Sequence, residues 1–253
     1  KVKIDELNYL LKDDYDYYQA YSSVYMIPGG EGISVQILTP NTITTITERQ
    51  YANAAITAGA SNMKILVSSV KEVDGSGALA GVYKAFSEQK AELPEENIKV
   101  AQEELVVTSN ITENNKDKSA YSDDALNAAV AEIKVKVQDA KDDAGGDESK
   151  VNVGEIVNDT LDNYRLDNVI TESDKRQLVQ LMEDFKKLKL TPEQKDALMH
   201  LGKTIIEKGG EIIDGARTFW DNLDEGTKSG IFGFFEGLWN GMVNFFKGLL
   251  NNL

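Results

Sequence analysis

The last 23 residues, Ile231 to Leu253, limit what this chain can fold into more than any other stretch. Thirteen of them are Ile, Leu, Met, Val, Phe or Trp, and only Glu236 and Lys247 are charged. At about 100° per residue, the apolar side chains fall on one side of a helix and the polar residues on the other. The apolar side consists of Ile231, Phe234, Phe235, Leu238, Trp239, Met242, Phe245, Phe246 and Leu249, followed by Leu250 and Leu253. Burial of each such side chain is worth roughly 1.5–3 kcal/mol, so the pattern predicts an amphipathic helix whose apolar face must be covered.

The sequence is compatible with three ways of burying the apolar face of this tail helix. The tail can pack against a predicted amphipathic helix between Gln194 and Leu223 and complete the core. It can dock on a membrane surface or on a hydrophobic protein partner, which is the role we predict for the first nine apolar residues given above. It can also form a homo-oligomer, because glycines at 233, 237 and 241 would allow helices to approach closely.

A transmembrane role for the tail is disfavoured, because Glu236, Asn240 and Asn244 would lie inside the hydrocarbon. The formal net charge of −15 comes from 27 basic and 42 acidic residues. This balance argues against nucleic acid as a partner and against electrostatic attraction to anionic lipids. Any membrane contact would therefore depend on the hydrophobic tail.

The residues that usually carry enzyme chemistry are scarce. The chain has no cysteine, and His200 is its only histidine. These facts exclude disulfides and thiolate sites and make a zinc site or a serine triad improbable. The acidic segment from Asp139 to Lys150 does not fit a calcium loop, because Ala144 stands where an EF-hand requires Gly and Lys150 where it requires Glu. We predict no catalytic residues, no metal and no cofactor.

The N-terminal half has the pattern of a small α+β fold. Two β-rich runs, Ser23 to Ile27 and Ile33 to Leu38, flank the turn residues Pro28 to Gly32, which predicts a β-hairpin. A capping box at Thr47 opens a helix that Gly59 can end, and a buried strand follows from Met63 to Val70. The prediction is therefore a β-hairpin plus a β-α-β unit, with further helices.

A glycine-rich stretch, Asp74 to Gly81, follows this strand and superficially resembles a phosphate-binding loop. The spacing of Gly75, Gly77 and Gly81 exceeds the usual fingerprint by one residue. The stretch also lacks a following parallel strand with an acid at its end. Small residues here more simply let a helix lie close to the sheet.

Helical patterns dominate the rest of the chain. We predict an α+β domain over residues 1–112, a connecting helix and acidic hinge over 113–150, a helical region over 151–225 and the apolar tail over 226–253. A polar, exposed connection is expected between Ser109 and Ser119, and a helix start at Thr191, where Pro192 and Gln194 follow the cap. The C-terminal half is thus predicted to be all-helical and to end in the amphipathic tail.

Several runs in the first half closely resemble a known family. They are Ser22-Ser23-Val24-Tyr25, Gly32-Ile33-Ser34-Val35, Ile43-Thr44-Thr45-Ile46-Thr47, residues 51–60, residues 77–86 and Glu103-Glu104-Leu105-Val106-Val107-Thr108-Ser109. The family comprises predicted secreted proteins of Gram-positive bacteria and is catalogued as domain of unknown function number one thousand and two. The resemblance implies export through a removed signal peptide, in keeping with a chain that begins at Lys1. It supplies no catalytic or binding residues.

These observations predict an exported, non-enzymatic protein of the cell envelope that binds a membrane surface or a hydrophobic partner through its tail. One alternative is an envelope hydrolase that uses paired carboxylates, such as those near Tyr15 to Tyr18. Another is a homo-oligomeric structural protein whose tail helix belongs to the core.

Overall fold

The computed structural model describes residues 3–5, 8, 18–88 and 93–208. The chain divides into two units, Lys1–Trp220 and Asp221–Leu253, and every described residue belongs to the first. The tail, with all nine of its predicted binding residues from Ile231 to Leu249, therefore lies outside the described residues. The predicted boundaries at 112, 150 and 225 stay a prediction.

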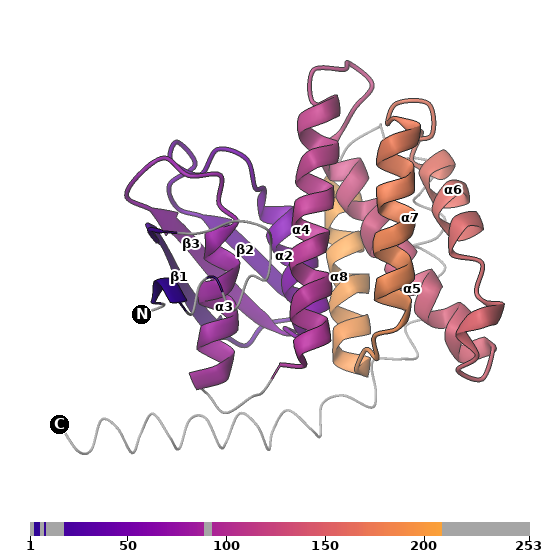
Figure 1. Cartoon of the computed structure of the whole chain (residues 1–253), viewed down its shortest axis with the longest axis horizontal. Helices are drawn as coiled ribbons and strands as arrows, with labels where there is room; N and C mark the ends of the chain where they lie inside the picture. The colour runs from indigo at the N-terminus through magenta and orange to yellow at the C-terminus, as the bar shows by residue number, and fades with distance from the viewer. Residues whose placement is uncertain (1–2, 6–7, 9–17, 89–92, 209–253) are drawn as a thin grey trace. The chain divides into compact units, whose positions relative to one another are not determined.

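Within the described residues, a small sheet is joined to a larger set of helices (Figure 1), which confirms the predicted α+β class. The strands are β1 (Ser22–Pro28), β2 (Ile33–Ile37) and β3 (Met63–Ser69). The helices are α2 (Glu48–Ala58), α3 (Gly77–Glu88), α4 (Glu95–Asn115), α5 (Asp123–Asp143), a short 3₁₀ turn (Glu148–Lys150), α6 (Val153–Asn163), α7 (Glu172–Lys186) and α8 (Pro192–Lys208). No helix among these is long and apolar enough to cross a membrane.

The predicted hairpin is wrong, because β3 lies between β1 and β2. The strand order is β1-β3-β2, with β1 antiparallel and β2 parallel to β3. The loop from Gly29 to Gly32 must therefore cross the end of β3, a span of about 10 Å for two strand spacings. Asn62 holds this loop, since its carbonyl accepts from Gly29 N (2.9 Å) and its side-chain oxygen accepts from Gly32 N (2.8 Å). The central place suits β3, whose Ile65 and Val67 are almost fully buried.

One face of the sheet is covered by helices. Helix α2 packs on β2, and α3 packs on β1. The predicted capping box of α2 is confirmed, with Gln50 N donating to Thr47 Oγ1 and Thr47 N donating to Gln50 Oε1. The predicted β-α-β unit is confirmed as well, because β2 and β3 are parallel and α2 connects them.

Helix α5 is central to the helical half. It contacts α2, α6, α7 and α8, and its Ala128, Val130 and Ile133 are fully buried. Helix α8 presents Leu198, Leu201 and Ile205 to this core, and its predicted start at Thr191 is confirmed by the Gln194 N bond to Thr191 Oγ1.

Helix α4 is longer than predicted. It continues through the polar residues after Val107 to Asn115, and the exposed connection is shorter, from Lys116 to Ala120. Thr108, Thr112 and Asn115 are buried, and their side chains donate to carbonyls three or four residues back. Burial against neighbouring elements thus outweighs the weak helix propensity of Thr and Asn.

Candidate functional site

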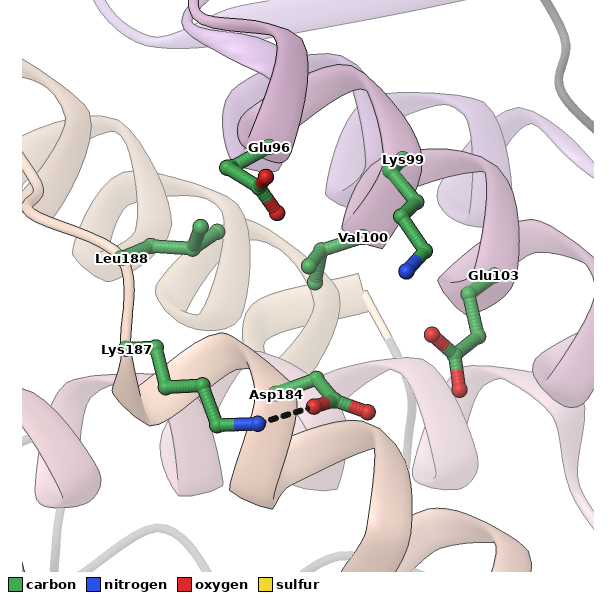
Figure 2. A pocket seen from close by; sticks show the side chains of 7 residues that line it. All are labelled: Glu96, Lys99, Val100, Glu103, Asp184, Lys187 and Leu188. Atoms are coloured by element: carbon green, nitrogen blue, oxygen red, sulfur yellow. Dashed lines mark hydrogen bonds and ion pairs between the residues drawn. The ribbon is translucent and has the colours of Figure 1, made fainter.

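A cavity of about 280 Å³ lies between α4 and the end of α7. The pocket is lined by four side chains from one face of α4, and Figure 2 shows Asp184 and Lys187, at the end of α7, on the opposite side. The lining residues are Glu96, Lys99, Val100, Glu103, Asp184, Lys187 and Leu188. The spacing of 96, 99, 100 and 103 is that of one helix face, which is why a single helix can supply more than half of the lining.

The two central carboxyls of this pocket have pKa values displaced in opposite directions. Burial raises the pKa of Glu103, and the nearby Asp184 charge adds to the rise while Lys99 and Lys187 oppose it. Burial also opposes ionisation of Asp184, but hydrogen bonds from Lys187 and Gln180 outweigh it and lower the pKa of that carboxyl. Lys187 Nζ lies 2.6 Å from Asp184 Oδ1.

Opposed pKa values in one pocket are what an acid-base pair requires. In this pocket, however, Asp184 is already paired with Lys187, and the remaining acids share the lining with Lys99. Most of the charge is balanced inside the pocket, so the cavity does not demand a charged ligand. No sequence signal points to it, because Glu103 and Asp184 are 81 residues apart. The acids near Tyr15 to Tyr17 that the hydrolase alternative used lie outside the described residues, and that alternative stays a prediction.

Asp174 links the ends of α4 and α7 that lie away from the cavity. As the third residue of α7, it completes a capping box with Thr171. Its carboxylate also accepts from Asn114 Nδ2 (3.1 Å) and Asn115 Nδ2 (3.0 Å) at the end of α4. Burial opposes the charged form, but the bonds from Asn115, Thr171 and Asn114 outweigh it and lower the pKa of Asp174.

We expect Asp174→Asn to be less stable than the wild type at neutral pH and the difference to shrink in acid. A carboxyl whose pKa is lowered on folding stabilises the fold above its unfolded pKa of about 3.9, and this contribution is lost as the pH falls through the folded value. Urea unfolding of both chains between pH 7 and pH 3 measures the difference. A difference that stays constant down to pH 3 would contradict the role given to the ionised carboxylate, and Asp117→Asn, in the exposed turn after α4, is the control.

A second polar cluster lies in the core between α2, α4 and α5. Lys134 Nζ lies 2.8 Å from Glu104 Oε1, and it also donates to Asn53 O and Thr57 Oγ1, both at 3.2 Å. The side chain of Lys134 is fully buried and that of Glu104 is 1% exposed. Burial lowers the pKa of Lys134, although the adjacent Glu104 favours its charged form. The pair and its partners on α2 thus join three helices in the core.

The acidic segment from Asp139 to Lys150, which begins in the last turns of α5, pairs with lysines. Asp139 accepts from Lys195 of α8, and Lys141 lies 2.8 Å from Glu148. Asp147 accepts from Ser149 N and caps the short 3₁₀ turn. Over the described part of the chain, no group of three or more potential ligands could hold a metal ion.

His200 packs against the loop between β1 and β2. A Cβ added at Gly32 would lie 2.5 Å from His200 Nδ1, so the ring fills the space that a side chain there would need. His200 Nδ1 is buried without a hydrogen-bond partner among the described residues. In the part of the chain that the structure describes, no serine is hydrogen-bonded to this ring, and its contact with Gly32 is one of packing.

The glycine-rich stretch also serves packing, as expected. A Cβ at Gly81 would lie 3.0 Å from Val24 Cγ2, which shows how closely α3 approaches β1. Within the loop, Asp74 accepts from Ser76 N and Ser76 Oγ. The Asp74 carboxylate therefore already accepts from the backbone N–H of Ser76, a group that a phosphate-binding loop would donate to its anion.

Comparison with known proteins identifies the family. The family described as "Protein of unknown function (DUF1002)" matches residues 1–200, well over half of the chain. The chain belongs to this family. A curated relative from Bacillus subtilis (strain 168), "Uncharacterized protein YpuA", is 33% identical over 166 residues, which cover 65% of this chain and 52% of the relative.

The chain thus spans about half the length of that curated relative. No solved structure matches this chain. Membership of DUF1002 confirms the resemblance carried by residues 22–109, and it assigns neither an activity nor a binding site. The matched residues include both helices of the pocket, α4 and α7, and the buried Lys134–Glu104 pair.

Proposed function

We propose that this DUF1002 protein is an exported, non-enzymatic protein that docks on a lipid surface at the cell envelope through its C-terminal amphipathic segment. The observation that carries the proposal is the separation of apolar and polar residues between Ile231 and Leu253, with Trp239 and five phenylalanines among 23 residues. Broad apolar faces rich in Trp and Phe are typical of helices that lie in a membrane interface. Glu236, Asn240 and Asn244 favour a helix that lies on the bilayer over one that crosses it.

The packing of α8 supports this proposal over a tail buried in the core. The alternative would use the apolar side of the helix predicted between Gln194 and Leu223, of which α8 is the described part, as the groove for the tail. In the structure that side, with Leu198, Leu201 and Ile205, is already covered by α5 and α2. Contacts with α5 and α2 thus account for the packing of α8, and residues 209–223 of the predicted groove lie outside the described residues.

Charge selects the kind of lipid surface. The net charge of −15 opposes approach to anionic lipids, and the tail itself contains one acid and one base. The apolar term alone must therefore hold the tail on the bilayer. We expect stronger docking on zwitterionic vesicles than on anionic vesicles at low salt.

Flotation with phosphatidylcholine vesicles tests the proposal. The full chain is expected to float, and a chain that ends at Gly226 is expected to remain in the dense fraction. Replacing Trp239 and Phe246 together by serine removes two apolar side chains, worth roughly 1.5 kcal/mol each at the lower end, and should weaken partitioning about a hundredfold.

A matched control changes the polar side of the same segment. Asn240→Ser with Asn251→Ser is expected to float like the wild type. The proposal is wrong if the shortened chain floats equally well, or if neither chain floats. Circular dichroism of each variant should show that the described domain is intact.

A further inference from the structure

We propose that two copies of this protein pair through the outer edge of β1, so that two three-stranded sheets become one continuous six-stranded sheet. This interface is separate from the tail and does not depend on membrane docking. Three observations carry it: the edge of β1 has no partner strand among the described residues, the strand contains no charged residue, and apolar side chains along it are exposed.

The two edges of the sheet are not alike. On the β2 side, the backbone N–H of Ile37 donates to Glu48 Oε1 (2.8 Å), so a charged side chain from α2 occupies that edge. Strand β1 is longer, with seven residues, and contains no charged residue. Among the described residues its backbone pairs with β3 alone. An uncharged edge that has no partner among the described residues is a template for another strand, and proteins that stay monomeric usually block such edges.

Charge is almost absent from the stretch of sequence that contains β1, although Lys71 reaches Tyr21 just before the strand (3.3 Å between Nζ and Oη). From Tyr18 to Thr47, a stretch of 30 residues, Glu31 is the only charged residue, whereas a chain with 27% charged residues would place about eight there. Two chains of net charge −15 repel each other over most of their surfaces. This neutral region is where two copies can approach with the least repulsion, which favours a second copy as the occupant.

Exposed apolar side chains gather on the same sheet. Of the six large hydrophobic residues that are exposed in the described part of the chain, Tyr25, Ile27, Leu38 and Val70 lie in the strands or directly beside them, and Tyr18 lies four residues before β1. The sixth, Val106, is on α4. Tyr25 is 66% exposed and is the middle residue of β1.

Antiparallel pairing of β1 with its copy uses these residues directly. A two-fold axis at Tyr25 places the two Tyr25 rings opposite each other and Ser23 opposite Ile27 of the second copy. Cross-strand aromatic and apolar pairs of this kind stabilise a sheet. Pro28, which has no N–H to donate, then falls at the end of the paired region, where its missing bond interrupts no further pairing.

Light scattering with size exclusion on the full chain tests the proposal. The wild type is expected to elute at twice its 27.9 kDa chain mass at micromolar concentration. Tyr25→Lys with Ile27→Lys places like charges opposite each other across the two-fold axis and is expected to raise the dimer dissociation constant at least tenfold. Val106→Lys, at the exposed position away from the sheet, should leave the dimer intact.

The absence of cysteine allows a second, geometric test. A single cysteine at Tyr25 is expected to form an intermolecular disulfide on mild oxidation, because the backbone of Tyr25 bonds to β3 and residues opposite in a non-hydrogen-bonded antiparallel pair have Cα atoms about 4.5 Å apart. Gln36→Cys, exposed on β2, should not, since five strand spacings would separate it from its copy. A monomeric wild type, a dimer that survives the double lysine substitution, or equal crosslinking at both positions would each overturn the proposal.

Discussion

Lys134→Met is expected to lower the free energy of unfolding by about 3–5 kcal/mol, the largest effect of any single substitution considered for this protein. The change removes the positive charge but leaves Glu104 in a site that is 1% exposed. The stranded carboxylate keeps a bond from Thr57 and loses its ionic partner. Loss of one partner of a buried pair costs far more than the pair itself contributes.

The matched control is the double substitution Lys134→Met with Glu104→Leu. It removes both charges and fills the space with apolar atoms, so we expect most of the lost stability to return. Urea unfolding, followed by circular dichroism, gives the midpoint and slope for each chain. If the double variant is as unstable as Lys134→Met alone, the loss comes from packing and not from the uncompensated charge.

Gly75→Ala is expected to destabilise the fold by about 2–4 kcal/mol, the second largest effect. Gly75 has a φ of +113°, where a side chain is strained. An added Cβ would also lie 2.5 Å from Tyr51 Oη and 2.9 Å from Ile43 Cγ2. Tyr51 is buried and donates to the Gly75 carbonyl, so it cannot move aside without losing that bond.

Gly77→Ala, two residues further on, provides the comparison. Nothing lies within 4 Å of a Cβ there, and the residue begins α3. We expect the thermal midpoint of this variant to equal or slightly exceed that of the wild type, since the free energy of unfolding should rise by at most about 1 kcal/mol. Equal losses for both substitutions would contradict the assignment of Gly75 to close packing at this loop.

Features governed by neighbouring residues could be predicted from the sequence. The capping boxes at Thr47 and Thr191, the β-α-β unit and the α+β class all follow from local hydrogen bonding and periodicity, and the structure has them. Helix α4 shows the limit of this reasoning. Its polar C-terminal turns have weak helix propensity, yet the helix continues because contacts with distant residues, such as Asp174 with Asn115, stabilise it.

The candidate site was not predictable. Glu103 and Asp184 line one pocket only because α4 and α7 pack together, and their separation in sequence carries no signal. Lys134 and Glu104 resemble ordinary surface charges in a sequence that is 27% charged. Their burial depends on how three helices meet, which no local pattern encodes.

Local sequence was sufficient for the fold class, for most helix starts and for the amphipathic pattern of Ile231 to Leu253, because each depends on the spacing of residues within a few turns. Tertiary structure alone placed β3 between β1 and β2 and thereby replaced the predicted hairpin. The reason is physical: a turn sequence permits a reversal, but strand order is set by which strand gains most from burial on both sides. The same choice left β1 at the edge of the sheet, where the proposed pairing with a second copy begins.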